Sequence, residues 1–296
     1  MKLLYYAIGG GTGHLVRALS ILRKFSGCKR EVLALSKFVD FVSEKGIKIC
    51  GFPTKKKDIF ELGKKIREKI FEYKPDLLFV DTFPGGCFGE LEEIPFKKIF
   101  IKRSECFHTG FFMVFDLRKL PPVLIRNFNE VGDRDLLRKK IGIYENEKTL
   151  FFYHNTKRDE VMKWTKISHN VSRELGLKFY FSSSYFTNDM KIDGFNLNYF
   201  PVMEILPAFD IVVTGGGYNS YFETTTLFNS AIFIPFRRKI DNQYERIDKE
   251  KYFLVENGRD FIKILEENID KFFLKENISF ENGADYIFSK VRSHFL

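Results

Sequence analysis

The chain has 296 residues, and at about 150 residues per domain this length predicts two domains. With 44% hydrophobic and 29% charged residues it can build packed cores, which excludes an intrinsically disordered chain. The net charge of +9 favours anionic partners, and no apolar run approaches the roughly 20 residues that a membrane-spanning helix needs.

The N-terminal residues 1–8 are apolar after one lysine and run into glycines without a small-residue cleavage site, so they predict a first strand and not a signal peptide. No pair of cysteines has the C-x-x-C spacing of a zinc or redox site; the four are Cys28, Cys50, Cys87 and Cys106. We therefore expect a reduced, cytoplasmic protein with no metal site and no cofactor.

The first half alternates strand and helix patterns, which predicts a parallel sheet with helices on both faces. The predicted strands span residues 3–8, 31–35, 47–50, 77–80 and 98–101. The predicted helices span residues 15–22, 38–46 and 59–73, the last with a lysine-rich outer face.

Residues 107–129 are rich in Phe, Pro and Arg and are interpreted as the end of the first domain and the approach to a linker. A second α/β series follows, with strands predicted at 149–153, 178–181, 210–214 and 231–234. Its helices are predicted at 133–141, 218–228, 243–257, 260–273 and 283–296. The sequence therefore predicts two Rossmann-like domains facing across a cleft, 1–130 and 131–296, with the last helix free to pack back on the first domain.

A first glycine loop, Gly9-Gly10-Gly11-Thr12-Gly13-His14, lies between a predicted strand and a predicted helix. Glycines permit close approach of a ligand, and the helix N-terminus favours an anion. The loop fits neither G-x-G-x-x-G nor a P-loop, so neither NAD nor ATP binding follows. His14 is a candidate general base, and Arg17 a candidate partner for an anion or an acid.

A second glycine loop, Gly215-Gly216-Gly217, occupies the corresponding position in the second half. Asn219, Ser220 and Glu223 follow it on a predicted helix, and Asp241-Asn242-Gln243 comes after the next strand. Ligands of doubly wound folds bind at the carboxyl ends of the strands, so both loops are predicted to line a binding site.

These motifs resemble GT-B glycosyltransferases of the family that includes the bacterial enzyme forming lipid II from UDP-N-acetylglucosamine (glycosyltransferase family 28). The similarity is carried by residues 10–14, by 215–223 and by 241–243, at the family's spacing. Residues 81–86, Asp-Thr-Phe-Pro-Gly-Gly, are similar to a segment of related glycosyltransferases.

The resemblance implies a GT-B fold and an inverting, metal-independent transfer from a nucleotide sugar, with UDP as the expected nucleotide, to an acceptor hydroxyl. It implies that His14, or a carboxylate such as Asp81, is the catalytic base. It also implies that basic side chains of residues 237–239, Arg237 among them, stabilise the leaving diphosphate. The donor and its diphosphate would be held by Gly11, Thr12, Gly13, Gly215, Gly216, Gly217, Asn219, Ser220, Glu223, Asn242 and Gln243.

The sequence departs from this family after the first strand of its second half. His154 and Asn155 stand where the family has a Gly-Gly-Ser loop, so they are candidates to replace its diphosphate contact. Two alternatives stay open: a nucleotide-sugar hydrolase, whose Gly-His-x-x-Arg start resembles residues 13–17, and an inactive nucleotide-sugar-binding protein. The acceptor is a sugar, a lipid or a cell-envelope glycan, membrane contact is open, and no nucleic-acid motif is present.

Three weaker patterns have structural interpretations. Asp133-Arg134-Asp135 is interpreted as charge at a helix N-terminus and not as a metal site. The Phe-rich residues 111–115 are interpreted as core, with a lipid contact as the alternative. The basic clusters at 55–57, 138–140 and 237–239 are interpreted as solvated surface.

Overall fold

The computed structural model describes residues 1–9, 12–35, 39, 42, 44–53, 59–103, 106, 108–183, 194–238, 241–276 and 278–295. The chain forms two compact units. Unit 1 comprises Met1–Ile125 and Glu281–Leu296, and unit 2 comprises Arg126–Phe280. Gly11, Lys239, the basic cluster 55–57 and most of the helix predicted at 38–46 lie outside the described residues.

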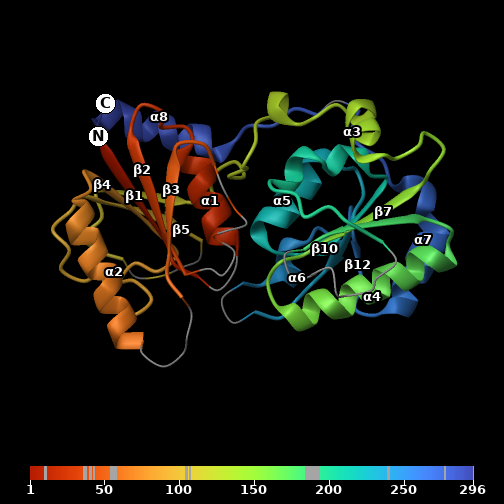
Figure 1. Ribbon diagram of the computed structural model, residues 1–296, viewed down its shortest axis with the longest axis horizontal. Coiled ribbons are helices and arrows are strands. Elements are labelled where there is room, and N and C mark those ends of the chain that lie inside the picture. The colour runs from red at the N-terminus through yellow and green to blue at the C-terminus, as the bar shows by residue number, and fades with distance from the viewer. Residues whose placement is uncertain are drawn as a thin grey trace. The chain divides into compact units, whose positions relative to one another are not determined.

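Unit 1 is built on a parallel six-stranded sheet with the order β3-β2-β1-β4-β5-β6 (Figure 1). Its strands are β1 (Lys2–Ala7), β2 (Lys29–Ala34), β3 (Ile47–Gly51), β4 (Leu77–Asp81), β5 (Lys98–Lys102) and β6 (Met113–Asp116). Its helices are α1 (Thr12–Leu22), α2 (Ile59–Tyr73) and α8 (Gly283–Phe295).

Alternation along β1 divides the core of unit 1 between the two faces of the sheet. Leu4 and Tyr6 pack with Ile66 and Ile70 of α2 on one face. On the other face Phe25, just after α1, lies against Phe79 of β4 and Phe288 of α8, at ring-centroid distances of 5.9 and 4.9 Å. Helices thus cover both faces, as a parallel sheet requires.

Unit 2 repeats this plan with the sheet order β12-β11-β10-β7-β8-β9, again with parallel pairing. Its strands are β7 (Thr149–Tyr153), β8 (Lys178–Ser182), β9 (Phe195–Asn196), β10 (Ile211–Gly215), β11 (Ile232–Ile234) and β12 (Phe253–Leu254). Its α-helices are α3 (Arg134–Ile141), α4 (Arg158–Glu174), α5 (Tyr218–Leu227), α6 (Gln243–Arg246) and α7 (Gly258–Asn268). Short 3-10 helices are η2 (Phe128–Glu130), η3 (Val202–Glu204), η4 (Leu206–Ala208) and η5 (Ile269–Lys271).

One core of unit 2 lies under α4 and α7, which pack side by side on one face of the sheet (Figure 1). Trp164 of α4 and Phe261 of α7 belong to it together with Phe152 of β7. On the opposite face Tyr221 of α5 packs against Phe233 of β11. The predicted α/β class with two Rossmann-like units is confirmed.

One sequence-based prediction is wrong in each unit. The helix predicted at 243–257 ends at Arg246, and the edge strand β12 follows a turn at residues 248–252. Residues 111–115 are not uniformly core: Phe112, just before β6, is half exposed, and within β6 Val114 is exposed whereas Phe115 is buried. Short edge strands carry too few residues for a clear period in the sequence.

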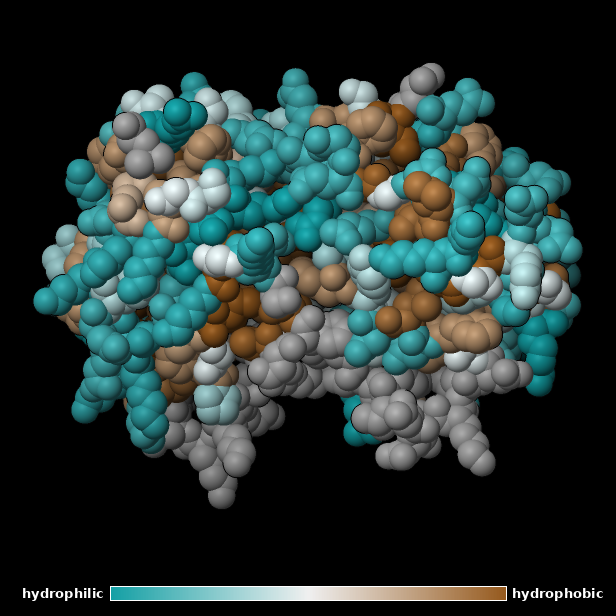
Figure 2. All heavy atoms as spheres, turned by 45° about the horizontal axis from the view of Figure 1, so that its top comes forward, coloured by the Kyte–Doolittle hydropathy of each residue, from teal (hydrophilic) through white to brown (hydrophobic). Residues whose placement is uncertain are grey.

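Polar side chains dominate one face of the molecule. On the face drawn in Figure 2, hydrophilic residues cover most of the area and hydrophobic ones gather in several separate patches. Among the described residues, no helix is both long and apolar enough to cross a membrane.

Candidate functional site

Both sheets reverse their strand order at one place. In unit 1 the order turns between β1 and β4, and in unit 2 between β7 and β10. The loops after adjacent strands diverge there, so the carboxyl ends of these strands form the crevice where such folds bind ligands. Each of the two places carries a histidine, a carboxylate and an arginine.

The cluster of unit 1 consists of His14, Arg17 and Asp81. Arg17 donates from Nε to Asp81 Oδ2 (2.8 Å) and from Nη2 to Asp81 Oδ1 (2.9 Å), a two-pronged ion pair. His14 Nδ1 lies 3.2 Å from Asp81 Oδ1 and 3.3 Å from Arg17 Nη2. Arg17 and Asp81 are buried, and His14 is only 9% exposed. The first two turns of α1 and the last residue of β4 thus hold one buried network.

The charges of this cluster fix the tautomer of His14. Burial raises the pKa of Asp81, but Arg17 and His14 outweigh this effect and hold the pKa well below its usual range, so this carboxyl is ionised. Burial lowers the pKa of His14 despite the opposing effect of Asp81, so the ring is neutral near pH 7. A neutral ring beside a carboxylate carries its proton on Nδ1, which leaves Nε2 as the acceptor.

Gly9 makes room for the Nε2 edge of this ring. A β-carbon at Gly9 would overlap the imidazole and stand 2.5 Å from Nε2. Among the described residues nothing hydrogen-bonds to Nε2, which faces the start of the glycine loop. This is the geometry of a general base held from behind by a carboxylate.

Thr82 holds Asp81 from the other side in a strained conformation. Its φ is 68°, and Phe83 N donates to Asp81 O (2.7 Å), closing a three-residue γ-turn of the rare type. The Thr82 hydroxyl donates to Asp81 Oδ1 (2.6 Å), and the Phe83 ring stacks on His14 with centroids 6.0 Å apart. A β-branched residue with this φ is a real outlier, and such strain concentrates at functional sites.

The cluster of unit 2, here called the His154 cluster, consists of His154, Glu160, Phe236 and Arg238. His154 Nε2 lies 3.3 Å from Glu160 Oε2, and Arg238 donates to both carboxylate oxygens, at 2.7 Å to Oε1. The His154 ring stacks on Phe236 at 4.5 Å between centroids, and the Arg238 guanidinium lies over the same Phe236 ring at 5.1 Å. The four side chains close a ring of contacts at the end of β7.

The glycine loop of unit 2 lies directly beside this cluster. A β-carbon at Gly215 would stand 2.8 Å from His154 Nδ1 and 3.1 Å from Phe236 Cε2, so the position requires glycine. Gly217 is the N-cap residue of α5. The α5 N-terminus therefore presents backbone N–H groups next to an imidazole, an arrangement suited to an anion.

The polar residues after β11 support this loop. Gln243 is buried and accepts a hydrogen bond from Phe236 N (2.9 Å), and Asn242 caps α6 by accepting from Glu245 N (3.4 Å). Arg246 Nη1 donates to Gly216 O (2.7 Å) and forms an ion pair with Asp241. Gln243 therefore has a supporting contact in this structure, while Asn242 is exposed.

Glu223 lies one and a half turns into α5 and is 7% exposed. Burial raises the pKa of this carboxyl to about 8, so it is protonated near pH 7. A neutral carboxyl both donates and accepts hydrogen bonds, which suits contact with paired hydroxyl groups.

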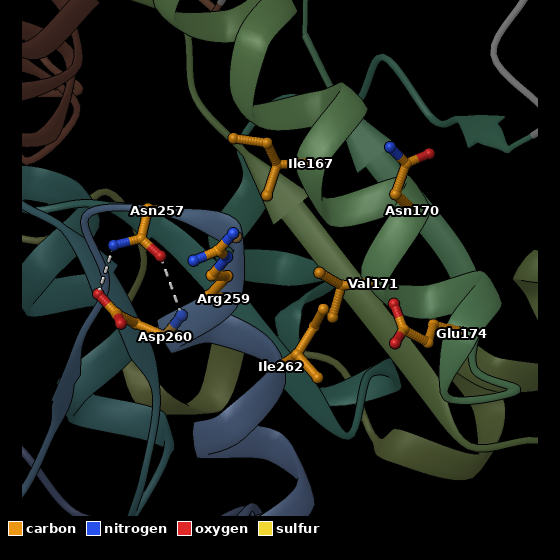
Figure 3. A pocket seen from close by; sticks show the side chains of 9 residues that line it. Ile167, Asn170, Val171, Glu174, Asn257, Arg259, Asp260 and Ile262 are labelled. Atoms are coloured by element: carbon orange, nitrogen blue, oxygen red, sulfur yellow. Dashed lines mark hydrogen bonds between the residues drawn. The ribbon is translucent and has the colours of Figure 1, made fainter.

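Two cavities lie along α4. One of about 320 Å³ adjoins the His154 cluster and is lined by Glu160, Trp164, Phe236, Arg237 and Tyr244, among others. The other, of about 730 Å³, lies between α4 and the start of α7, where Asn257 caps the helix by accepting from Asp260 N (Figure 3). Ile167, Val171 and Ile262 give it an apolar floor, and its lining includes no predicted site residue.

The predicted residues thus fall into two groups, one in each unit. His14, Arg17 and Asp81 come together in unit 1, with Thr12 and Gly13 in the first turn of α1. In unit 2 the glycine loop, Asn219, Ser220 and Glu223 lie at the start of α5, and His154 and the half-buried Asn155 follow β7. Arg237 is exposed and lines the smaller cavity.

Two basic clusters are not solvated surface throughout, which corrects the sequence-based interpretation. Arg138 is buried and donates to the carbonyls of Tyr144, Glu147 and Ala208. Arg238 is ion-paired to Glu160. Asp133 of the Asp-x-Asp string caps α3, accepting from Asp135 N and Leu136 N at 3.0 Å.

Sequence reasoning missed Glu160 and Thr82. Glu160 stands in the first turn of α4, shortly after the histidine that follows β7, and that placement is the one signal that was available. Thr82 has none, because its role depends on a backbone angle.

No protein-family model matches the chain, and no curated protein matches its sequence. Among solved structures, the chain is similar to the Streptomyces sp. SF2575 glycosyltransferase SsfS6 complexed with thymidine diphosphate, at 12% identity and a TM-score of 0.61, covering 99% of both chains. It is similar to the spinosyn rhamnosyltransferase SpnG complexed with spinosyn aglycone, at 10% identity and a TM-score of 0.60, covering 99% of this chain and 96% of that one. It is also similar to the glycosyltransferase VinC in complex with dTDP, at 11% identity and a TM-score of 0.57, covering 99% of both chains. The fold is therefore that of GT-B glycosyltransferases.

Proposed function

We propose that this protein is a glycosyltransferase that moves a sugar from a nucleoside diphosphate donor to an acceptor hydroxyl, with inversion and without a metal ion. The observation that carries the proposal is the neutral His14, paired with the ionised Asp81 at the switch point of unit 1 and presenting Nε2 at the glycine loop. Full-length similarity to glycosyltransferase structures supports it.

In this reaction His14 Nε2 accepts the proton of the acceptor hydroxyl while the oxygen attacks the anomeric carbon of the donor. The bond from that carbon to the diphosphate breaks on the opposite face, so a single displacement inverts the configuration. Asp81 is a positioning residue: it holds the tautomer of His14 and stabilises the imidazolium that forms. Arg17 keeps Asp81 ionised, so the carboxylate does not compete for the proton.

Unit 2 binds the donor in this proposal. The α5 N-terminus with Gly215, Gly216 and Gly217 takes the diphosphate, whose growing negative charge the backbone N–H groups stabilise. Glu223, protonated and buried, binds the ribose hydroxyls. The segment with Asn242 and Gln243 contacts the sugar.

UDP is the expected nucleotide from the resemblance of the glycine loops to the UDP-dependent family. Similar solved structures contain thymidine diphosphate, so dTDP is the second nucleotide to test. The acceptor is a sugar, a lipid or a glycan hydroxyl.

The first test is thermal stability with UDP, GDP, dTDP, CDP and NAD, each at millimolar concentration. A nucleotide at about 100 times its dissociation constant stabilises the protein by roughly 2.7 kcal/mol. We expect one nucleoside diphosphate to stand out and Glu223→Ala to remove its effect. If no nucleotide raises the melting temperature, the donor-site assignment is wrong.

The second test incubates the matching nucleotide sugar with and without candidate acceptors. Sugar joined to an acceptor supports the transferase. Free sugar released at the same rate without any acceptor identifies the hydrolase instead, because water then takes the acceptor's place at His14. Nucleotide binding with neither product identifies a binding protein.

A further inference from the structure

The His154 cluster leaves one nitrogen of its imidazole without a partner. Burial raises the pKa of Glu160, but the hydrogen bonds from His154 and Arg238 outweigh this effect and lower the pKa to about 2, so this carboxyl is ionised. Because a carboxylate only accepts, the neutral His154 ring carries its proton on Nε2, toward Glu160. Nδ1 is then an acceptor, and among the described residues nothing donates to it.

This nitrogen faces the place where an anion would bind. The Nδ1 edge points at Gly215, two positions before the N-cap residue of α5, and His154 is 93% buried as its 7% exposure shows. An acceptor nitrogen and a phosphate oxygen repel each other, whereas an imidazolium N–H and a phosphate oxygen form a strong charge-assisted hydrogen bond. An anion in this loop therefore favours the charged form of His154.

The surrounding charges permit that change. From α4, Glu160 favours the imidazolium, and Lys157 Nζ lies 3.7 Å from the same carboxylate. After β11, Arg238 opposes the imidazolium. On the other side of the glycine loop Arg246 and Asp241 neutralise each other. Burial keeps the pKa of His154 below its usual value in the free protein, so the ring is uncharged at pH 7.5.

We propose that His154 is a proton-linked diphosphate contact: a nucleoside diphosphate bound at the Gly215–Gly217 loop draws one proton from solvent onto Nδ1, and Glu160 and Arg238 are the positioning residues that set this exchange. The inference rests on the proposed donor site of unit 2. The proton comes from the buffer, Nε2 keeps its hydrogen bond to Glu160, and no covalent bond to the ligand forms. The donor affinity is then highest below the pKa of the free ring and falls by up to about tenfold per pH unit above it.

The test is isothermal titration calorimetry of the stabilising nucleoside diphosphate at pH 7.5, in two buffers of different ionisation enthalpy. The difference in heat gives the number of protons taken up. We expect between about half and one proton for the wild type and a clear loss of this uptake in His154→Gln, with weaker binding. The terminal phosphate of the ligand titrates near pH 6, so the nucleotide sugar, which lacks that group, is measured in parallel.

Two further variants separate proton linkage from simple support of the loop. Glu160→Gln removes the carboxylate that favours the imidazolium, so uptake and affinity at pH 7.5 both fall. Arg238→Gln removes the opposing charge, so the free ring is more basic and the fall of affinity with pH shifts to higher pH. If the two substitutions only disturbed the structure of the loop, both variants would bind more weakly. Their pH profiles would then not shift in opposite directions.

His169→Gln is the matched control. This residue is on the same helix as Glu160 and packs on Phe179, away from the glycine loop. It is expected to bind as the wild type does. Binding of the nucleotide sugar without proton uptake, with affinity flat between pH 6 and 8.5, would overturn the role of His154 and leave the donor site intact. Absence of nucleotide binding would instead overturn the proposed function.

Discussion

The two units use the same three kinds of side chain at the same topological place and connect them differently. In unit 1 the histidine is on the helix after the first strand and the carboxylate ends a neighbouring strand. In unit 2 the histidine follows the strand and the carboxylate is on the helix. As a result Asp81 engages Nδ1 of His14, while Glu160 engages Nε2 of His154.

In each histidine, the ring nitrogen that contacts the carboxylate determines the direction in which the other ring nitrogen points. His14 presents Nε2 to Gly9 and His154 presents Nδ1 to Gly215, and in both places glycine provides the space. The carboxylates also differ, since Asp81 is fully buried whereas the side chain of Glu160 is 19% exposed. The first network suits a base that must return to neutrality after each turnover, and the second suits a contact that charges when an anion arrives.

The largest expected effect separates these two histidines. His14→Gln is expected to lower the transfer rate by about 10²- to 10⁴-fold, the usual contribution of a general base, and to leave nucleotide affinity within about twofold. His154→Gln is expected to weaken nucleotide binding more than it lowers the rate at saturating donor. Single-turnover rates and calorimetric affinities measured on both variants check this. Equal losses of rate and affinity in the two variants would break the comparison.

The second effect compares the buried carboxylate with the partly exposed one. Asp81→Asn leaves Arg17 buried without its counter-charge, and breaking such a pair costs about 3 to 5 kcal/mol. Glu160→Gln should cost less, because water screens its pair with Arg238. Urea unfolding at pH 7 measures both. The folded pKa of Asp81 is lowered, so its contribution to the free energy of unfolding is present above about pH 4 and is lost as the pH falls. The stabilities of Asp81→Asn and the wild type should therefore converge in acid.

Glu223 provides the opposite pH dependence within unit 2. Its folded pKa of about 8 lies above the unfolded value of about 4.3, so stability is lost as the pH rises through this window. Glu223→Gln avoids that loss: without nucleotide, its stability should match that of the wild type at about pH 4, below the unfolded pKa, and exceed it by up to a few kcal/mol at pH 8.5. Each kcal/mol raises the melting temperature by about 2 to 4 °C. Parallel melting curves across this pH range would contradict an isolated, buried carboxyl.

The smallest effect concerns Tyr5, a further donor to Asp81 beside Arg17, His14 and Thr82. Tyr5 donates to Asp81 Oδ2 (3.1 Å), an oxygen that Arg17 also binds. Tyr5→Phe should therefore cost only about 1 kcal/mol and leave the pH dependence of transfer in place. Asp133→Ala, which removes the cap of α3 in unit 2, should cost a similar amount and is the control for a purely structural change. Loss of transfer in Tyr5→Phe alone would show that Asp81 needs all of its donors.

Buried strands and the periodic helix α2 were predictable from the sequence, whereas the helix α4 was not predicted. β1, β4, β7 and β10 read as apolar runs, and α2 as an amphipathic stripe, because burial of one face dictates these patterns. β12 was absorbed into a predicted helix and β6 into a predicted linker, since two to four residues carry no period. Among the site residues, glycine loops marked His14 and Gly215. Glu160 was not predicted, because its contact with His154 depends on how the short connection between β7 and α4 turns, which the residue types alone do not show.

The placement of α8 has a consequence for how the chain forms during synthesis. α8 packs on α1, its Phe288 contacts Phe25 just after that helix, and Asn282 exchanges hydrogen bonds with Leu124, so residues 281–295 complete the first unit. The ribosome makes all of unit 2 before it supplies this helix. While the nascent chain grows, unit 2 can close around its own core, whereas the apolar flank beside α1 stays open until α8 has been made. Aromatic surface of unit 1 is therefore exposed for longer than that of unit 2, and chaperones that recognise such surface would bind it during that time.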